Sequence, residues 1–277
     1  MKTSRRMVEQ YGPWAVVTGA SDGIGRAFAV EAAKAGLHLV LVARRQDRLE
    51  ILARELETAR GVKTLVVASD LSTQIGRDEV VSAVKDLDVG LFVAAAGFGT
   101  SGPVLRADLE KERLMLDVNC YALFAHCIHF GQRFAARGSG GIILMSSLVG
   151  WQGTPWAAHY AATKAYVQAL AEAMHMELKP SGVDVLASAP GPVHSGFAAQ
   201  SDMRLGTAAT PEDVAKASLA VLGNQTTVVP GLLSKFLTYS LATLPRTLRT
   251  RVMGSVMHGM TKHQRVQTAS GEQRLRQ

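Results

Sequence analysis

The sequence predicts an α/β fold: a doubly wound three-layer sandwich around a central parallel sheet of about seven strands. Short apolar runs rich in β-branched residues recur along the chain, and longer helix-length segments separate them. Strands that alternate with helices pair in parallel through right-handed crossover connections. With 277 residues, 47% of them hydrophobic, and no repeat or Ser/Gly-rich linker, the chain can enclose one such core.

The expected strands follow one another along the chain. They cover residues 14–17, 38–42, 63–68, 90–93, 141–145, 183–187 and 226–229. Ligands of such sheets bind beyond the carboxyl ends of the strands, so the informative residues should cluster in the loops that follow them. The sequence agrees, since "TGASDGIG" follows the first strand, "AAAGFG" the fourth, "SS" the fifth and "PGPVHSGF" the sixth.

The first of these loops is rich in glycine and precedes a helix-like segment. Glycine is needed where a turn takes positive φ, where backbone approaches a diphosphate and where a helix packs closely on a strand. The helix amino terminus then offers free N–H groups and a positive dipole end to phosphates. The loop favours a dinucleotide site over a purely structural turn. The expected contacts are Gly19, Ser21, Asp22, Gly23, Ile24 and Gly25.

The end of the second strand indicates which dinucleotide binds. A site specific for NAD often carries a carboxylate here for the ribose 2′-hydroxyl, but this chain has Ala43 followed by Arg44 and Arg45. An arginine can hold a 2′-phosphate bidentately, whereas a carboxylate would repel it. The pattern favours NADP(H) over NAD(H), with Arg44 as the main contact and Arg45 as the second. The alternative is that both arginines only solvate the strand end.

The segment "HYAATK" at residues 159–164 places a phenol and an ammonium four residues apart. On a helix, Tyr160 and Lys164 lie one turn apart on the same face, so both can act on one substrate atom. The ammonium, aided by a positively charged nicotinamide, favours the phenolate and predicts a lowered Tyr160 pKa. Lys164 can also donate to ribose hydroxyls of the cofactor. The alternative, an ordinary pair on a solvated helix, holds only where the pair stands alone.

The sequence resembles the short-chain dehydrogenase/reductase family from residue 12 to about residue 230. The motifs "TGASDGIG", "AAAG", "YAATK" and "PG" occur in the family's order, together with Asn119 and Ser147. The resemblance implies a Rossmann-type fold in which Tyr160 is the acid/base and Lys164 its partner. It also implies that Ser147 orients the carbonyl and that Asn119 belongs to a water-linked proton relay.

Further cofactor contacts are expected in the loops after the third, fourth and sixth strands, besides the Tyr160 and Lys164 pair. They are Asp70, Leu71, Ala96, Gly97, Pro190, Gly191, Val193 and Ser195. Asp70 could equally cap the next helix. The chain departs from the family pattern where Ala94 and Ala95 replace an asparagine pair, where Asp22 replaces a basic residue common in NADPH-preferring relatives, and where Ser195 replaces threonine.

These features predict an oxidoreductase that transfers a hydride between NADP(H) and a ketone or secondary alcohol. The expected substrate is a small, lipophilic molecule, such as an acyl or steroid-like one. The alternative is a cofactor-bound scaffold or regulator with little turnover, but binding alone requires neither Tyr160 nor Ser147. A homodimer or homotetramer is a family expectation.

The sequence predicts no metal site. His126 and His129 form H-x-x-H, but no carboxylate or cysteine completes metal-ligand spacing, so packing is preferred. Cys120 and Cys127 do not show the spacings of a disulfide framework, which is consistent with a protein in a reducing, cytoplasmic compartment.

Some aromatic residues are candidates for an apolar substrate site, although core packing is their default role. They are Trp151, Trp156 and Phe197. By the resemblance, residues 197–210 hold the substrate lid. Thr210 followed by Pro211 then predicts the start of a helix.

The net charge of +7 is confined to the end of the chain. Residues 1–230 contain 22 Lys and Arg against 22 Asp and Glu, whereas residues 231–277 contain 8 against 1. This division argues against a nucleic-acid-binding face on the main body. The uncharged stretches 139–158 and 217–234 contain Gly, Pro and polar residues, so we expect no transmembrane helix.

The chain is expected to comprise one catalytic domain, residues 1–230, and a basic, partly helical extension, residues 231–277. Apolar residues recur in the extension at helical spacing, between basic residues. They are Leu248, Val252, Met253, Val256, Met257 and Met260. We expect a helix docked on the core or on a second subunit, in preference to a weak membrane-surface contact or a basic substrate lid. Residues 266–277 are expected to fray.

Overall fold

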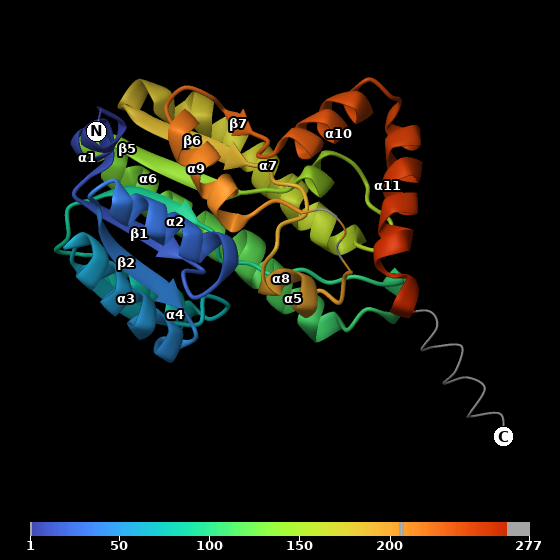
Figure 1. Cartoon of the computed structure of the whole chain (residues 1–277), viewed down its shortest axis with the longest axis horizontal. Helices are drawn as coiled ribbons and strands as arrows, with labels where there is room; N and C mark the ends of the chain where they lie inside the picture. Colours follow the sequence, from blue (N-terminus) through green and yellow to red (C-terminus); the bar gives the residue numbers. More distant parts are fainter. Residues whose placement is uncertain (1, 205, 207, 265–277) are drawn as a thin grey trace.

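The structure, a computed structural model, describes residues 2–204, 206 and 208–264 (Figure 1). Within these residues, seven parallel strands form one sheet in the order β3-β2-β1-β4-β5-β6-β7. The strands are β1 (Trp14–Thr18), β2 (His38–Ala43), β3 (Thr64–Ala68), β4 (Val89–Ala94), β5 (Gly140–Met145), β6 (Val183–Ser188) and β7 (Thr227–Val228). Every predicted strand is present, which confirms the fold class.

Helices cover both faces of the sheet and make the outer two layers of the sandwich (Figure 1). One layer contains α2 (Gly23–Lys34), α3 (Gln46–Arg60) and α9 (Pro211–Val221), and the other α4 (Gln74–Ala83), α6 (Leu123–Arg137) and α7 (Ala158–Leu178). The helices outside these layers are α1 (Lys2–Tyr11), α5 (Leu109–Leu116), α8 (Gly196–Gln200), α10 (Leu232–Ala242) and α11 (Arg246–Met260).

The strands are buried on both faces, as parallel sheets require. Successive residues of β1 therefore belong to different cores. Val17 packs with Phe28 of α2 in one layer, whereas Val16 packs with Phe130 of α6 in the other. This double burial explains why the strands appear in the sequence as continuous apolar runs instead of alternating ones.

The centre of the sheet is tied together by a hydroxyl. Thr18, at the end of β1, donates from Oγ1 to the Val93 carbonyl (3.3 Å) and accepts from the Ala96 amide (3.1 Å). This bridge lies beside Ala94 and Ala95, where the family pattern has two asparagines. Thr18 thus links β1 to the loop after β4 without their side-chain amides.

Side-chain caps set the starts of two helices. Thr210 accepts from the Asp213 amide (3.1 Å) and Pro211 is the first residue of α9, as predicted. The capping alternative for Asp70 is wrong, because Thr73 caps α4 by accepting from the Gly76 amide (3.0 Å).

The two last helices of the described chain lie at the carboxyl edge of the sheet, where α11 stands at the end of the molecule opposite α1 (Figure 1). Met253 and Met257 of α11 are buried. This agrees with the expected helix docked on the core. Among the described residues, no helix combines the length and the apolar character needed to cross a bilayer.

Candidate active site

A cavity of about 730 Å³ opens beyond the carboxyl ends of the strands. Its wall includes all the site residues predicted from the sequence except Asn119, so the structure brings together residues as far apart in the sequence as Gly19 and Ser195. Asn119 lies directly behind the wall, since a Cβ added to Gly97 would come within 2.8 Å of its Oδ1.

The glycine loop fits a dinucleotide. Gly19 has φ +70°, and a Cβ there would approach the Ala95 carbonyl oxygen to 2.8 Å. Gly23, with φ +51°, begins α2, and its amide donates to the Asp22 carboxylate (2.7 Å). Side chains are thereby kept off the turn, and the amino terminus of α2 lies at the cavity wall, as a diphosphate group requires.

Three arginines gather where the expected 2′-phosphate would lie. Arg44, Arg45 and Arg48 line the cavity, and Arg45 donates from Nη2 to the Ser21 hydroxyl (2.9 Å). One Asp22 oxygen lies 3.6 Å from both Arg45 and Arg48. Sequence reasoning missed Arg48, although its place in the first turn of α3, four residues after Arg44, was a usable signal.

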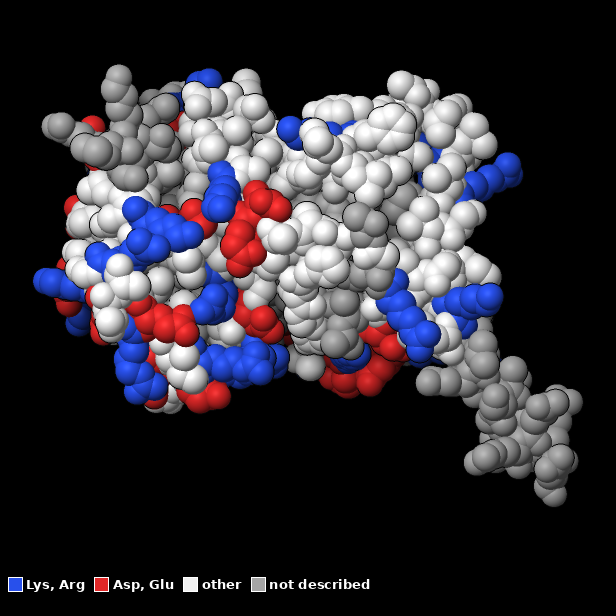
Figure 2. All heavy atoms as spheres, in the orientation of Figure 1, with Lys and Arg blue, Asp and Glu red and all other residues white. Residues whose placement is uncertain are grey.

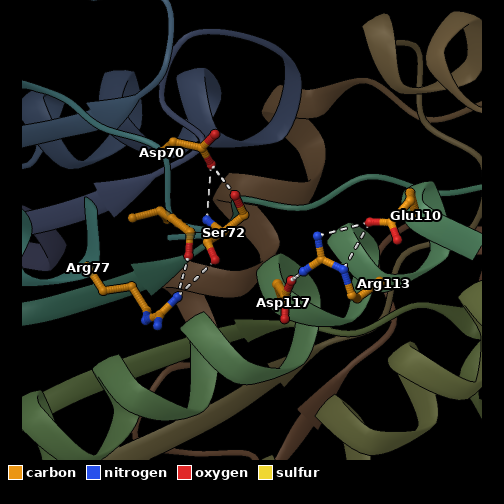
Figure 3. A network of polar contacts seen from close by, with 7 residues as sticks. Asp70, Ser72, Arg77, Glu110, Arg113 and Asp117 are labelled. Atoms are coloured by element: carbon orange, nitrogen blue, oxygen red, sulfur yellow. Dashed lines mark hydrogen bonds and ion pairs between the residues drawn. The ribbon is translucent and has the colours of Figure 1, made fainter. Parts of the chain in front are cut away.

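The loop after β3 is held in place from α4 (Figure 3). Asp70 accepts from the amide (3.0 Å) and the hydroxyl (2.8 Å) of Ser72, and Arg77 donates to the carbonyls of Leu71 (3.2 Å) and Ser72 (3.1 Å). The Arg77 guanidinium also lies 4.7 Å from the centre of the Tyr121 ring. Asp70 and Leu71, which were expected to contact the cofactor, are therefore braced by a residue that the sequence did not indicate.

Tyr160 and Lys164 lie one turn apart on α7, and both line the cavity although only 8% and 7% of each residue is exposed. The Ser147 side chain interacts with the Tyr160 phenol, and its hydroxyl also makes a long hydrogen bond to the Pro190 carbonyl (3.4 Å). Lys164 donates from Nζ to the Met145 carbonyl (2.8 Å), at the end of β5. Lys164 is thereby fixed to the end of this strand, two residues before Ser147.

Asn119 fastens the loop after β4 to α7. It lies in a π-helical segment, Asp117–Ala122, between α5 and α6. Its Nδ2 donates to the Phe98 carbonyl (2.8 Å) and the Thr163 hydroxyl (3.2 Å), and its Oδ1 accepts from the Phe98 amide (3.1 Å). Arg113 braces this segment through Asp117 (2.8 Å; Figure 3).

Burial dominates the protonation of the pair. It raises the pKa of Tyr160, which the hydrogen bond from Ser147 only partly offsets, and it lowers the pKa of Lys164 to about 8. The direction for Tyr160 is opposite to the lowering that we expected from the neighbouring ammonium. In the protein alone, desolvation thus keeps the phenol protonated at neutral pH.

The rest of the cavity wall is apolar. The Phe197 ring lies 5.3 Å from the Tyr160 ring, and it continues into a surface rich in methionine. That surface consists of Met203, Leu237, Met253, Val256, Met257 and Met260. Of the three aromatic candidates, Phe197 lines this cavity, whereas Trp156 lines a smaller hollow beside α11. Sequence reasoning placed Met253, Met257 and Met260 on a docked helix and kept a substrate lid only as the less favoured alternative.

A cluster of polar contacts joins the end of α11 to two loops at the site. Gln264 donates from Nε2 to the Ser101 hydroxyl and the Asp202 carbonyl, both at 2.8 Å, and His263 lies 2.9 Å from the Asp202 carboxylate. The Ser101 hydroxyl also donates to the Ser201 carbonyl (2.7 Å). We call these residues, Ser101, Ser201, Asp202, His263 and Gln264, the clasp.

The other polar candidates form no site. The described residues contain no group of three or more His, Cys, Asp or Glu side chains that could hold a metal ion. His126 packs beside Phe92 and Phe130, and burial lowers its pKa to about 4. Burial raises the pKa of Cys120 to about 11, so that thiol is not activated.

Comparison with known proteins adds to this geometry. A family model described as short chain dehydrogenase matches residues 13–205. The 7beta-hydroxysteroid dehydrogenase of Collinsella aerofaciens is 32% identical over 241 residues, which cover 82% of this chain and 89% of that protein. A solved 7beta-hydroxysteroid dehydrogenase superposes with a TM-score of 0.83 at 30% identity, over 89% of this chain and 98% of the other. A short-chain dehydrogenase from Sphingobium yanoikuyae in complex with NADPH gives a TM-score of 0.76 at 27% identity, over 83% and 93%.

Proposed function

The chain belongs to the short-chain dehydrogenase family and is an oxidoreductase that acts on CH–OH groups, and from that premise we propose how its residues carry the reaction. It transfers a hydride between a nicotinamide cofactor and a ketone or secondary alcohol with a lipophilic body. The single observation behind the assignment of roles is that Ser147, the buried Tyr160 phenol and the Lys164 ammonium, one helical turn from Tyr160, meet at the wall of one cavity.

When bound, the cofactor supplies or accepts the hydride at its nicotinamide ring. Tyr160 gives its phenolic proton to the oxygen that becomes the alcohol, and Ser147 donates a hydrogen bond to the same oxygen. Both donors act where negative charge develops in the transition state, so they accelerate the step instead of only retaining substrate. Lys164 stabilises the phenolate left behind, and Asn119 positions the path by which Tyr160 is reprotonated.

The cofactor preference that we propose is NADP(H) over NAD(H). It is supported by Arg44, Arg45 and Arg48 around Ser21, by the absence of a carboxylate at Ala43, and by the NADPH complex of the Sphingobium relative. Arg44 remains the first candidate for the 2′-phosphate, since Arg45 and Arg48 are near Asp22.

The substrate class that we propose is a bulky, rigid, apolar ketone or its alcohol, of steroid-like shape. The support is the methionine-rich wall, because methionine adapts to irregular apolar surfaces, together with the activity named for the Collinsella relative.

We also propose that the chain forms a homo-oligomer. Tyr121, Phe124 and Ile128 expose 59%, 39% and 46% of their surfaces on the π-helical segment and α6, and they offer an apolar face to a second copy.

A cofactor-oxidation assay tests the proposed function. Purified protein is mixed with NADPH or NADH and a panel of ketones that runs from small polar molecules to steroids. We expect NADPH oxidation with the steroids, little with the small ketones, and slower rates with NADH. No turnover with any ketone or alcohol would instead support the scaffold alternative.

A further inference from the structure

The outward face of α10 is apolar. Leu232, Leu233, Phe236 and Tyr239 expose 87%, 52%, 70% and 65% of their surfaces, whereas the buried residues of the helix include the polar Ser234 and Thr238 beside Leu241. A helix on a water-soluble surface normally presents charged or polar residues to the solvent. Contiguous exposed apolar residues of this kind mark an interaction surface.

The next helix, α11, also exposes apolar residues, and basic residues lie in the same part of the chain. Leu248 and Val252 of α11 are each 41% exposed. Residues 231–264 contain no Asp or Glu, but they contain the basic residues Lys235, Arg246, Arg249, Arg251 and Lys262. Figure 2 shows uncharged surface over α10 and blue side chains projecting from α11.

We propose that α10 and α11 dock this face on the surface of a bilayer that contains anionic lipids. The apolar side chains enter the boundary between headgroups and acyl chains, and the basic side chains lie among the anionic headgroups. A second copy of the chain is a poorer occupant. A two-fold interface sets the same patch against itself, so it would bring the basic residues of both copies together without a carboxylate between them.

The inner sides of these helices are part of the cavity wall. Leu237 of α10 lines the cavity, as do Met253 and Met257 of α11, while other residues of the same two helices, such as Phe236 and Leu248, are exposed. A bilayer-soluble substrate therefore meets the cavity beside the surface in which it is dissolved. This consequence rests on the proposed function, whereas the docking itself does not.

Vesicle flotation tests the docking with the full chain. Vesicles are made of phosphatidylcholine alone or of phosphatidylcholine mixed with phosphatidylglycerol. We expect flotation with the anionic vesicles, weaker flotation with the neutral ones, and loss of binding at high salt. The double variant Leu233→Ser/Phe236→Ser should bind at least about tenfold more weakly, since two apolar side chains are removed from the contact. Ile75→Ser, at a 73% exposed position of α4, is the matched control and should bind like the wild type.

Charge reversal provides a second arm. Arg246→Glu/Arg251→Glu should lower the partition onto anionic vesicles roughly tenfold or more, and Arg54→Glu, at an exposed position of α3, should not.

Two flotation results would overturn the proposal: equal flotation of all variants, or no flotation of the wild type on anionic vesicles. So would a change of mass in sedimentation caused by Leu233→Ser/Phe236→Ser without lipid, because that result identifies the face as an interface between copies. Thermal unfolding checks the fold of each variant. Intact flotation without ketone reduction would count against the proposed function alone.

Discussion

At residue 160, burial and the proposed chemistry act in opposite directions. Desolvation raises the pKa of the Tyr160 phenol. Burial also lowers the pKa of Lys164 to about 8, so the ammonium is less able to stabilise the phenolate. A protonated phenol is the form that carbonyl reduction needs, whereas alcohol oxidation needs the phenolate. Burial of Tyr160 therefore favours the form that carbonyl reduction needs.

This difference gives a pH prediction. From about pH 6 to about pH 8, we expect kcat for ketone reduction to change little, because Tyr160 stays protonated, and kcat for alcohol oxidation to rise as phenolate forms. Initial rates in both directions across that range measure the two pH profiles.

The proton-donor role of Tyr160 gives a prediction of its own. Tyr160→Phe should lower kcat by about 10²–10⁴-fold, while the Kd of NADPH, measured by fluorescence titration, stays the same. Substantial turnover by that variant would contradict the assignment.

The arginine cluster gives another prediction, because Asp22 competes with phosphate for Arg45 and Arg48. Arg48→Ala should raise the KM of NADPH about three- to tenfold and leave the KM of NADH unchanged, since a partly exposed charge contact is lost.

The opposite change is expected at Asp22. Asp22→Asn keeps a capping side chain on α2 but removes the negative charge, so it should lower the KM of NADPH. Steady-state kinetics with both cofactors measure these shifts, with Arg54→Ala as control; equal changes for NADPH and NADH would contradict the role.

The residues that sequence reasoning found and missed differ in how they reach the site. Tyr160, Ser147 and the glycine loop follow strand ends directly, or stand at helical spacing, so local patterns are enough to place them. Arg48, four residues after Arg44 in the first turn of α3, also had a local signal, which was overlooked. Arg77 reaches the site from α4, and its contacts depend on how that helix packs. No local pattern specifies that packing.

At the scale of elements, the π-helical segment is another feature that local sequence patterns do not predict. The sequence does not indicate it, because π-helical turns carry no clear sequence signature. Here the segment accompanies three hydrogen bonds that join the Asn119 side chain to Phe98 and Thr163. The strands and the start of α9 were predictable, because burial and capping are local demands. The position of α11 over the cavity was not, because it results from contacts across more than 100 residues, such as that between Ser101 and Gln264.

The clasp predicts a change in substrate binding. Gln264→Ala removes two hydrogen bonds that hold the end of α11 to Ser101 and Asp202, so the methionine-rich wall should be less well positioned. We expect the KM of a steroid ketone to rise about three- to tenfold, with the KM of NADPH unchanged. Gln46→Ala, on the exposed surface of α3, is the control. An equal rise in both Michaelis constants would indicate a general loss of structure instead.

At the scale of the whole molecule, one buried ammonium links stability to pH. The folded protein releases the Lys164 proton near pH 8, whereas the unfolded chain holds it to about pH 10. Between these values the unfolded state binds more protons, so the free energy of unfolding gains a term that rises with pH.

Relative to Lys164→Met, the wild type should therefore gain about 2 to 3 kcal/mol of stability between about pH 8 and about pH 10.5. Urea unfolding of both proteins at several pH values, followed by circular dichroism, measures the difference. Taking the difference between the two proteins removes the effect of Cys127, whose raised pKa acts in the opposite direction. A difference that is constant with pH would contradict the buried ammonium.

The placement of the methionine-rich wall has a consequence for how substrate selectivity can diverge among homologues. Chemistry depends on loops and helices before residue 200, whereas four of the six wall residues beyond Phe197 come from α11 and a fifth from α10. Divergence confined to that short hairpin can reshape the chamber for a new molecule without disturbing proton transfer. Exchanging the hairpin between homologues is accordingly a direct way to transplant selectivity.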